Sequence, residues 1–227
     1  MRNLLKFILA LVIAFLLMLA FRSLAFTIYE VPSPGIKSHL IAGDRVIVNR
    51  WSYGLRTGGE GFFSYSRWIS SPVEKGDLVV FNFPLDTIHD ISDRAVYAGY
   101  CDALPGDTVR IGSIQIEIPG KGRIIKVDSS NIKMLCNIYI LHEKRKAHIQ
   151  NGKLYVDGKE VSYCCFKNNY YWISSRDGSN QMDSRYFGPL PESHIIGRMV
   201  MLVYSKDAGK PFYSGFRDDR WFIWLND

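Results

Sequence analysis

The chain has few of the side chains that most often build metal centres. Its 227 residues include only four cysteines and five histidines. No Cys-x-x-Cys pair occurs, because only Cys164 and Cys165 are close in sequence, and this spacing matches no zinc motif. The sequence also lacks a nucleic-acid recognition motif, and its basic residues are scattered. We therefore expect no metal, no other cofactor and no nucleic-acid partner.

The composition indicates a folded domain with a cationic surface. Hydrophobic residues make up 47% of the chain and aromatic residues 14%, which argues against disorder. The length suits one core, or one core that carries an insertion. The formal net charge of +6 suits a protein near an anionic membrane surface.

One long apolar run is present, from Phe7 to Phe21, and Leu4 and Leu5 extend it. Crossing a bilayer as a helix takes about 20 apolar residues. Residues 4–21 come close to that length, so the sequence predicts one N-terminal transmembrane helix that acts as a signal anchor.

Charges beside this run predict its orientation. Arg2 and Lys6 precede the apolar residues, so the positive-inside rule places residues 1–3 in the cytoplasm and residues 27–227 across the membrane. We expect a single-pass protein of the cell inner membrane that contacts membrane lipid and has its main domain on the periplasmic side. The alternative is a cleaved signal peptide, because the residues up to Ala25 have the small-x-small form of a cleavage site.

Short β runs that follow Gly-Asp turns predict a mainly β, antiparallel domain. In such turns glycine takes the positive φ and aspartate hydrogen-bonds to the backbone. The runs are RVIVNRW (45–51), LVVFNF (78–83) and TVRIGSIQIEI (108–118), and HIIGRMVMLVY (194–204) is a further expected strand. Within KLYVDGKEV, the pair Asp157-Gly158 is typical of a two-residue β-hairpin.

Residues 129–146 predict a helix instead, with Ser129 or Ser130 as the N-cap and basic residues at its end. Together with the β runs on either side, this helix indicates a small inserted segment at about residues 112–150. Two aromatic-rich stretches, residues 58–70 and 220–227, are typical either of a membrane interface or of ordinary core packing.

Five blocks in this order resemble bacterial signal peptidase I, the membrane-anchored Ser-Lys protease that removes signal peptides from exported proteins. The blocks are AGDRVIVNRWSYGLR (42–56), KGDLVVFNFP (75–84), ALPGDTV (103–109), NGKLYVDGKEV (151–161) and DSRYFGPLPESHIIGR (183–198). The resemblance runs over essentially the whole chain and implies the antiparallel β domain of that family.

The positions that carry catalysis in this family depart from its pattern. The family nucleophile segment, Pro-Ser-x-Ser-Met, matches residues 32–36 and places the nucleophile on Gly35. The family base segment, Tyr-x-Lys-Arg, places the lysine on Gly99, and the serine that hydrogen-bonds to this lysine falls on Gln181. Ser33 matches the side-chain donor to the oxyanion. A serine needs a base that takes its proton, so the resemblance predicts a catalytically degenerate member, a pseudoprotease.

The resemblance also implies a cleft in which a peptide lies as an added β-strand. Its expected lining residues are Val31, Pro32, Ser33, Pro34, Ile36, Val96, Tyr97 and Ala98. Backbone pairing requires no catalytic side chain, although Pro34 removes one backbone donor. We hypothesise that the protein binds signal peptides or an envelope partner, beside an active signal peptidase or within an export or assembly complex.

Two other hypotheses stay open. The first is an active signal peptidase with relocated catalysis, in which Ser33 or Ser38 is the nucleophile and Lys37 or His39 the base. Geometry argues against it, because neighbours in an extended segment point to opposite faces and a lysine in a polar loop stays protonated. The other histidines fit no Ser-His-Asp pattern, and we expect them to be exposed to solvent: His89, His142, His148 and His194. The second is a structural subunit that binds a partner complex through residues 58–70.

Overall fold

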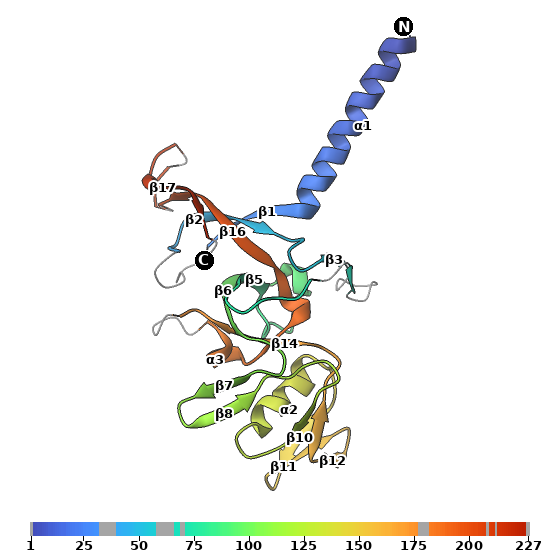
Figure 1. The fold of residues 1–227 in the computed structure, drawn as a ribbon, viewed down its shortest axis with the longest axis vertical. Coiled ribbons are helices and arrows are strands. Elements are labelled where there is room, and N and C mark those ends of the chain that lie inside the picture. The colour runs from blue at the N-terminus through green and yellow to red at the C-terminus, as the bar shows by residue number, and fades with distance from the viewer. Residues whose placement is uncertain are drawn as a thin grey trace.

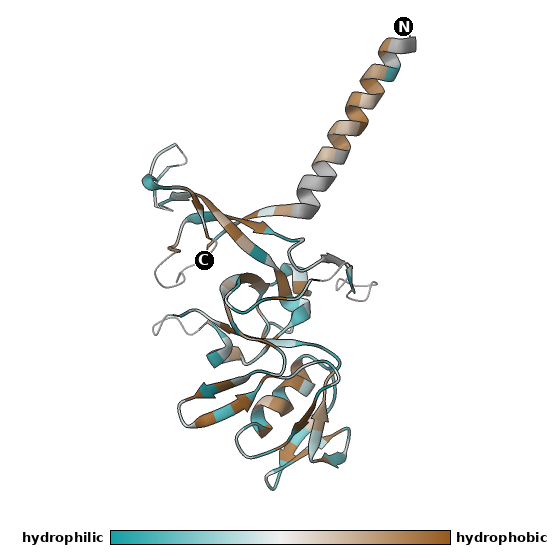
Figure 2. Ribbon diagram, in the orientation of Figure 1, coloured by the Kyte–Doolittle hydropathy of each residue, from teal (hydrophilic) through white to brown (hydrophobic). Residues whose placement is uncertain are grey.

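Helix α1 (Arg2–Ala25) projects from one end of a curled antiparallel sheet (Figure 1). The computed structural model describes residues 2–31, 40–57, 66–68, 71–176, 182–207, 209–211 and 213–225. Apolar residues predominate along α1 (Figure 2), and strand β1 (Phe26–Glu30) follows it directly. Among the helices of these described residues, none combines the length and the apolar character that crossing a membrane requires.

The main sheet has the strand order β1-β2-β16-β5-β6-β14-β15, and β17 also pairs with β16. Every neighbouring pair in it is antiparallel, which confirms the predicted mainly β class. Its further strands are β2 (Asp44–Asn49), β5 (Leu78–Asn82), β6 (Val96–Ala103), β14 (Tyr170–Ser174), β15 (Leu190–Pro191), β16 (Ile195–Lys206) and β17 (Phe216–Trp224). Strands β2, β5 and β16 occupy the expected runs.

Strand β16 curls the sheet. Its register shifts once against β5 and twice against β2, and extra residues of this kind bend a strand and increase its twist. Arg198 pairs with both β5 and β2, whereas Met201 pairs with both β17 and β2. Strands β5 and β17 therefore follow one another along the same edge of β16.

Three Gly-Asp turns precede the strands as expected. The glycines have positive φ values of 91° at Gly43, 96° at Gly76 and 91° at Gly106. In each turn the following aspartate accepts a hydrogen bond from the backbone N–H three residues before it, at 2.9–3.0 Å. Glycine and aspartate thus act together to reverse the chain.

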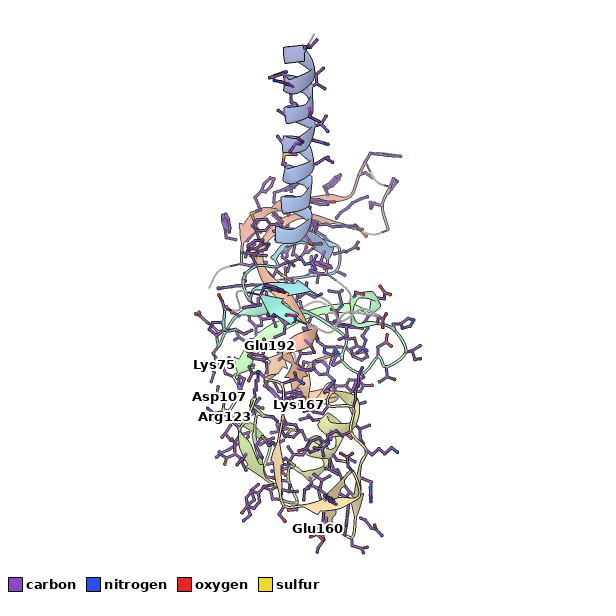
Figure 3. All side chains as sticks on the ribbon, turned by 90° about the vertical axis from the view of Figure 1, so that its right-hand side faces the viewer. Lys75, Asp107, Arg123, Glu160, Lys167 and Glu192 are labelled. Atoms are coloured by element: carbon purple, nitrogen blue, oxygen red, sulfur yellow. The ribbon has the colours of Figure 1, made fainter. Side chains whose placement is uncertain are left out.

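A lobe with its own core lies at the end of the molecule opposite α1 (Figure 1). It contains β7 (Thr108–Ile111), β8 (Ile114–Glu117), β9 (Ile124–Lys126), α2 (Ile132–Leu141), β10 (Ala147–Gln150), β11 (Lys153–Val156), β12 (Lys159–Val161) and β13 (Tyr163–Cys165). Glu160 marks the far tip of the lobe, and Lys167 and Glu192 lie nearer the main sheet (Figure 3). The hairpin between β11 and β12 is confirmed, since Asp157 and Gly158 both have positive φ.

Helix α2 begins later than expected. Its N-cap is Asn131, whose side chain makes no capping hydrogen bond, so the prediction of Ser129 or Ser130 as the N-cap was wrong. The carboxylate of Asp128 instead accepts hydrogen bonds from the backbone N–H groups of Ser130 and Asn131. This Asx-type turn takes the place of a serine cap.

Short elements complete the fold. They are β3 (Leu55–Thr57), β4 (Ser66–Trp68), the 3-10 helices Ile91–Asp93 and Glu192–His194, and α3 (Ser184–Phe187). All four cysteines are free thiols; Cys101, Cys136 and Cys164 are buried and Cys165 is exposed.

Candidate functional site

Strand β6 lies at the centre of the candidate site, and its two faces pack into different cores. Val96, Ala98 and Tyr100 are half-buried against one core of apolar residues, which we call the cleft cluster because three of the predicted cleft residues belong to it. The buried members of this cluster are Val31, Leu40, Val46, Val48, Leu78, Val80, Ile196, Met199 and Leu202. Tyr97 and Cys101 face the other way and pack with Val79 and Ile173. This alternation is the period of two expected of a strand.

Of the four described lining residues of the predicted cleft, the structure brings three together: Val31, Val96 and Ala98. Val31 is 4% exposed and belongs to the cleft cluster, as Val96 and Ala98 do, although 65 residues or more separate Val31 from them in the sequence. Tyr97 points to the opposite face. The predicted residues Pro32, Ser33, Pro34, Gly35 and Ile36 lie outside the described residues, as do Ser38, Lys37, His39 and Gln181.

Among the described residues, one edge of β6 beside this cluster has no partner strand. On its first edge, Val96, Tyr97 and Ala98 pair with β5. On its second edge, β14 pairs only with the later part of β6, ending at Tyr100 opposite Ser174. Within the described ranges no strand pairs with the second edge of residues 96–98. An unpaired edge of this kind can accept an extended peptide as an additional strand.

Gly99, the family lysine position, is buried and tightly enclosed. A Cβ atom placed there would lie 2.5 Å from Cγ2 of Ile173 and 3.1 Å from the carbonyl oxygen of Ser174. Real Cβ contacts of 2.5 Å essentially never occur, and Cγ2 of a β-branched side chain cannot rotate away freely. The end of β14 therefore occupies the space into which any longer side chain at position 99 has to extend.

A cation that follows β14 in the chain covers the next residue of β6. The guanidinium of Arg176 lies 3.9 Å from the ring centroid of Tyr100, within cation–π range, and its Nη2 is 3.1 Å from the carboxylate of Asp102. Tyr100 stands where the family motif has arginine. Sequence analysis did not predict this contact, because Arg176 and Asp102 are 74 residues apart.

A hydrogen-bonded network fixes the chain after β14. The carboxylate of Asp183 accepts hydrogen bonds from the backbone N–H of Ser175 at 3.0 Å, from its hydroxyl at 3.1 Å, and from Arg185 at 2.7 Å. Burial alone raises the pKa of Asp183, but the hydrogen bonds from Arg185 and Ser175 outweigh it and lower the pKa. The network holds α3 against β14, behind the enclosed Gly99.

Two of the histidines that we expected to be exposed are not. His194 is only 4% exposed, and its Nε2 lies 3.1 Å from Nη1 of Arg94. His142 contacts the ring of His194 at 5.6 Å, and burial lowers the pKa of His142 to about 4, with Arg94 adding to the effect. This prediction was wrong for both residues, because a lone histidine gives no sequence signal that separates packing from exposure. His89 and His148 are exposed as expected.

The described residues contain no group of three or more His, Cys, Asp or Glu side chains that could hold a metal ion. Among the described residues, the site offers apolar side chains, a strand edge that no described strand pairs with, and a glycine without a functional side chain.

Comparison with known proteins places the chain in a family. A family model described as signal peptidase, peptidase S26, matches residues 4–204. The chain belongs to this family. Among curated relatives, Signal peptidase I of Rickettsia bellii (strain OSU 85-389) is 29% identical over 227 residues, which cover 88% of this chain and 72% of that protein.

Other curated relatives are more distant but similarly extensive. Signal peptidase I of Buchnera aphidicola subsp. Acyrthosiphon pisum is 24% identical over 240 residues, covering 86% of this chain and 74% of that protein. Signal peptidase I of Haemophilus influenzae is 23% identical over 248 residues, covering 88% and 70%. The resemblance read from the five blocks is thus confirmed at the level of the signal peptidase family.

Proposed function

We propose that this chain is a pseudoprotease of the signal peptidase I family, which binds an extended peptide segment without cleaving it. The observation that carries the proposal is the packing at Gly99. A general base must reach the nucleophile within about 3 Å, and Ile173 and Ser174 fill the space in which the family lysine would extend. Gly35 at the nucleophile position provides no hydroxyl group.

Three features support peptide binding beside β6. No described strand pairs with the second edge of residues 96–98, Val96 and Ala98 are half-buried rather than sealed in the core, and Val31 lies in the same cleft cluster. Backbone hydrogen bonds along such an edge provide affinity, and alternate side chains enter pockets. The ligand that fits best is a signal peptide, whose small and apolar side chains match this lining.

The proposed location is the inner membrane. The apolar run at residues 4–21 and the exposed large apolar side chains of α1, such as Phe7 and Phe15, support an N-terminal anchor. The cationic residues before the run support a cytoplasmic N-terminus and a domain on the periplasmic side. An active signal peptidase or an export or assembly complex is the partner we propose there.

The test combines binding and cleavage in one experiment on the full-length chain in detergent. A fluorescent signal peptide is titrated, and the same samples are analysed by mass spectrometry for products. We expect saturable binding with no product. A peptide of the same sequence with N-methylated backbone amides serves as the control, because it cannot donate the strand-pairing hydrogen bonds.

A protein variant tests the location of binding. Ala98→Trp fills the cleft beside β6 and should abolish binding, whereas Gln115→Trp, on an exposed strand of the lobe, should leave it unchanged. Equal binding by both variants would place the peptide elsewhere. Product formation by the unmodified chain would favour the rival function, an active signal peptidase, which is the name carried by the relatives.

A further inference from the structure

One residue, Asp44, holds the chain before and after residues 32–39, at Val31 and at Ile41. The backbone N–H of Val31 donates to the carbonyl oxygen of Asp44 at 2.9 Å. The backbone N–H of Ile41 donates to the Asp44 carboxylate at 2.9 Å, and Asp44 N–H donates back to the carbonyl of Ile41 at 3.1 Å. The positions of Val31 and its neighbour in the cleft cluster, Leu40, therefore depend on Asp44.

The carboxylate of Asp44 is in turn held by strand β17. Asp44 is fully buried, and Arg220 binds it with two hydrogen bonds, Nε to Oδ1 at 3.1 Å and Nη2 to Oδ2 at 2.6 Å. Arg217, from the same strand, donates to the carbonyl of Ala42 at 3.2 Å. Bidentate charge-assisted pairs of this kind are strong and fix orientation as well as distance.

The end of β17 also reaches the cleft cluster. The backbone N–H of Leu225 donates to the carbonyl of Val200 at 3.1 Å, and the Leu225 side chain packs against the same cluster as Val31 and Ala98. Strand β17 lies beside β16, which separates it from β2 in the sheet (Figure 1). Residues 216–225 fall outside the part of the chain that the family model matches.

We propose that β17 holds Val31 and Leu40 in place relative to β6, a role that we call the latch, and that Arg220 is the positioning residue of β17 for peptide binding. This inference rests on the proposed function. Binding an extended peptide is favourable only when both sides of the cleft are already ordered, because ordering them on binding reduces the affinity. Arg220 contributes through Asp44 and does not itself contact the peptide.

The first experiment uses no peptide and tests whether Arg220 keeps the Val31 and Ile41 amides protected from hydrogen exchange. Amide hydrogen exchange is followed at Val31 and Ile41 in the full-length chain in detergent. In Arg220→Gln we expect exchange at both amides to accelerate by about tenfold or more, since a lost hydrogen bond to a charged group is of that order. Arg145→Gln, which breaks the exposed pair with Asp157, is the matched control and should leave both amides unchanged.

The second experiment measures affinity for the fluorescent signal peptide. Arg220→Gln should weaken binding by about tenfold, and Arg220→Lys, which keeps the charge but loses the bidentate geometry, should lie between Arg220→Gln and the unmodified chain. If Arg220→Gln does not fold, Arg220→Lys and Leu225→Ala replace it in both experiments. We then expect a smaller acceleration of exchange and a smaller loss of affinity.

The outcomes separate the two proposals. Unchanged exchange at Val31 and Ile41 in the Arg220 variants overturns the latch, whatever the peptide does. Faster exchange with unchanged affinity leaves Arg220 a purely structural residue and overturns its positioning role. The third outcome is that exchange is faster in the Arg220 variants but even the unmodified chain binds no peptide. This result confirms the latch, and it refutes both the proposed function and the positioning role.

Discussion

Replacing the enclosed Gly99 in β6 by alanine should change the stability of the fold in the direction opposite to the usual one. Replacing a glycine by alanine where the backbone accepts an L-residue normally stabilises a protein by about 0.4–1 kcal/mol, because it restricts the unfolded chain. Gly99 lies within a strand and has no positive φ, so its backbone is compatible with alanine. We nevertheless expect Gly99→Ala to destabilise the fold.

The magnitude follows from the two contacts of the added methyl group. At 2.5 Å from Cγ2 of Ile173 and 3.1 Å from the carbonyl oxygen of Ser174, it can fit only if β14 moves. Overpacking of this kind costs about 1–3 kcal/mol. For a chain of this size, each kcal/mol corresponds to a Tm change of about 2–4 °C.

The assay is thermal and urea-induced unfolding of the variant beside two comparisons. Gly209→Ala is the matched control, because its Cβ atom would meet nothing closer than 3.5 Å and its φ is not positive. The double variant Gly99→Ala/Ile173→Ala removes the obstructing methyl group, so the two changes should be less than additive by about 1 kcal/mol or more. If Gly99→Ala is as stable as Gly209→Ala, the argument that position 99 is closed is refuted.

Three further predictions follow from the site. Restoring the family residues in a Gly35→Ser/Gly99→Lys variant should yield no cleavage of a preprotein, because a lysine at position 99 has no space; a processed product on a gel would contradict this. The half-buried His142 is held neutral with a pKa of about 4, below its unfolded value, so its contribution to stability is complete above about pH 6.5 and is lost as the pH falls towards 4. Urea unfolding at pH 7 and pH 4.5 should therefore show a larger loss for the unmodified chain than for His142→Asn, and equal losses would refute the assignment. Asp183→Asn weakens the network behind β14 and should lower the unfolding free energy by about 1–3 kcal/mol in urea titrations; a change below 0.5 kcal/mol, which is the usual size for a surface substitution, would contradict the role of the network.

Local turn chemistry made much of the sheet predictable from the sequence. The strands that follow Gly43 and Gly76 form as expected, because each glycine adopts the positive φ that the turn requires. The single run expected after Gly106 instead forms the hairpin of β7 and β8, with Gly112 at positive φ between them. The hairpin at Asp157-Gly158 was predictable for the same reason. These features depend on residues within a few positions of one another, so they can be recognised in a single sequence.

Strand β17 could not be predicted in the same way. Its residues, FRDDRWFIW, show no alternation of polar and apolar side chains, and most of them are exposed in the structure. It is held by pairing with β16 and by the contact of Arg220 with Asp44, 176 residues earlier in the chain. Partners so far apart leave no local pattern.

The sequence predicted which side chain is missing at position 99 but not how the space around Gly99 is filled. The aligned motif identified a missing lysine, but it could not show that the space was filled. That closure comes from the pairing of β6 with β14, in which Ile173 lies opposite Cys101 and contacts the position of a Cβ atom on Gly99. Whether a lost catalytic residue leaves a vacant or an occupied site is a property of tertiary packing.

The most direct test of the central claim is a cleavage assay on the purified full-length chain. A labelled preprotein is incubated with it in detergent, beside an active signal peptidase as the positive control. We expect no product after prolonged incubation. Product cut at the mature junction, and abolished by Ser33→Ala or Ser38→Ala, would contradict it and show that the catalytic groups have moved.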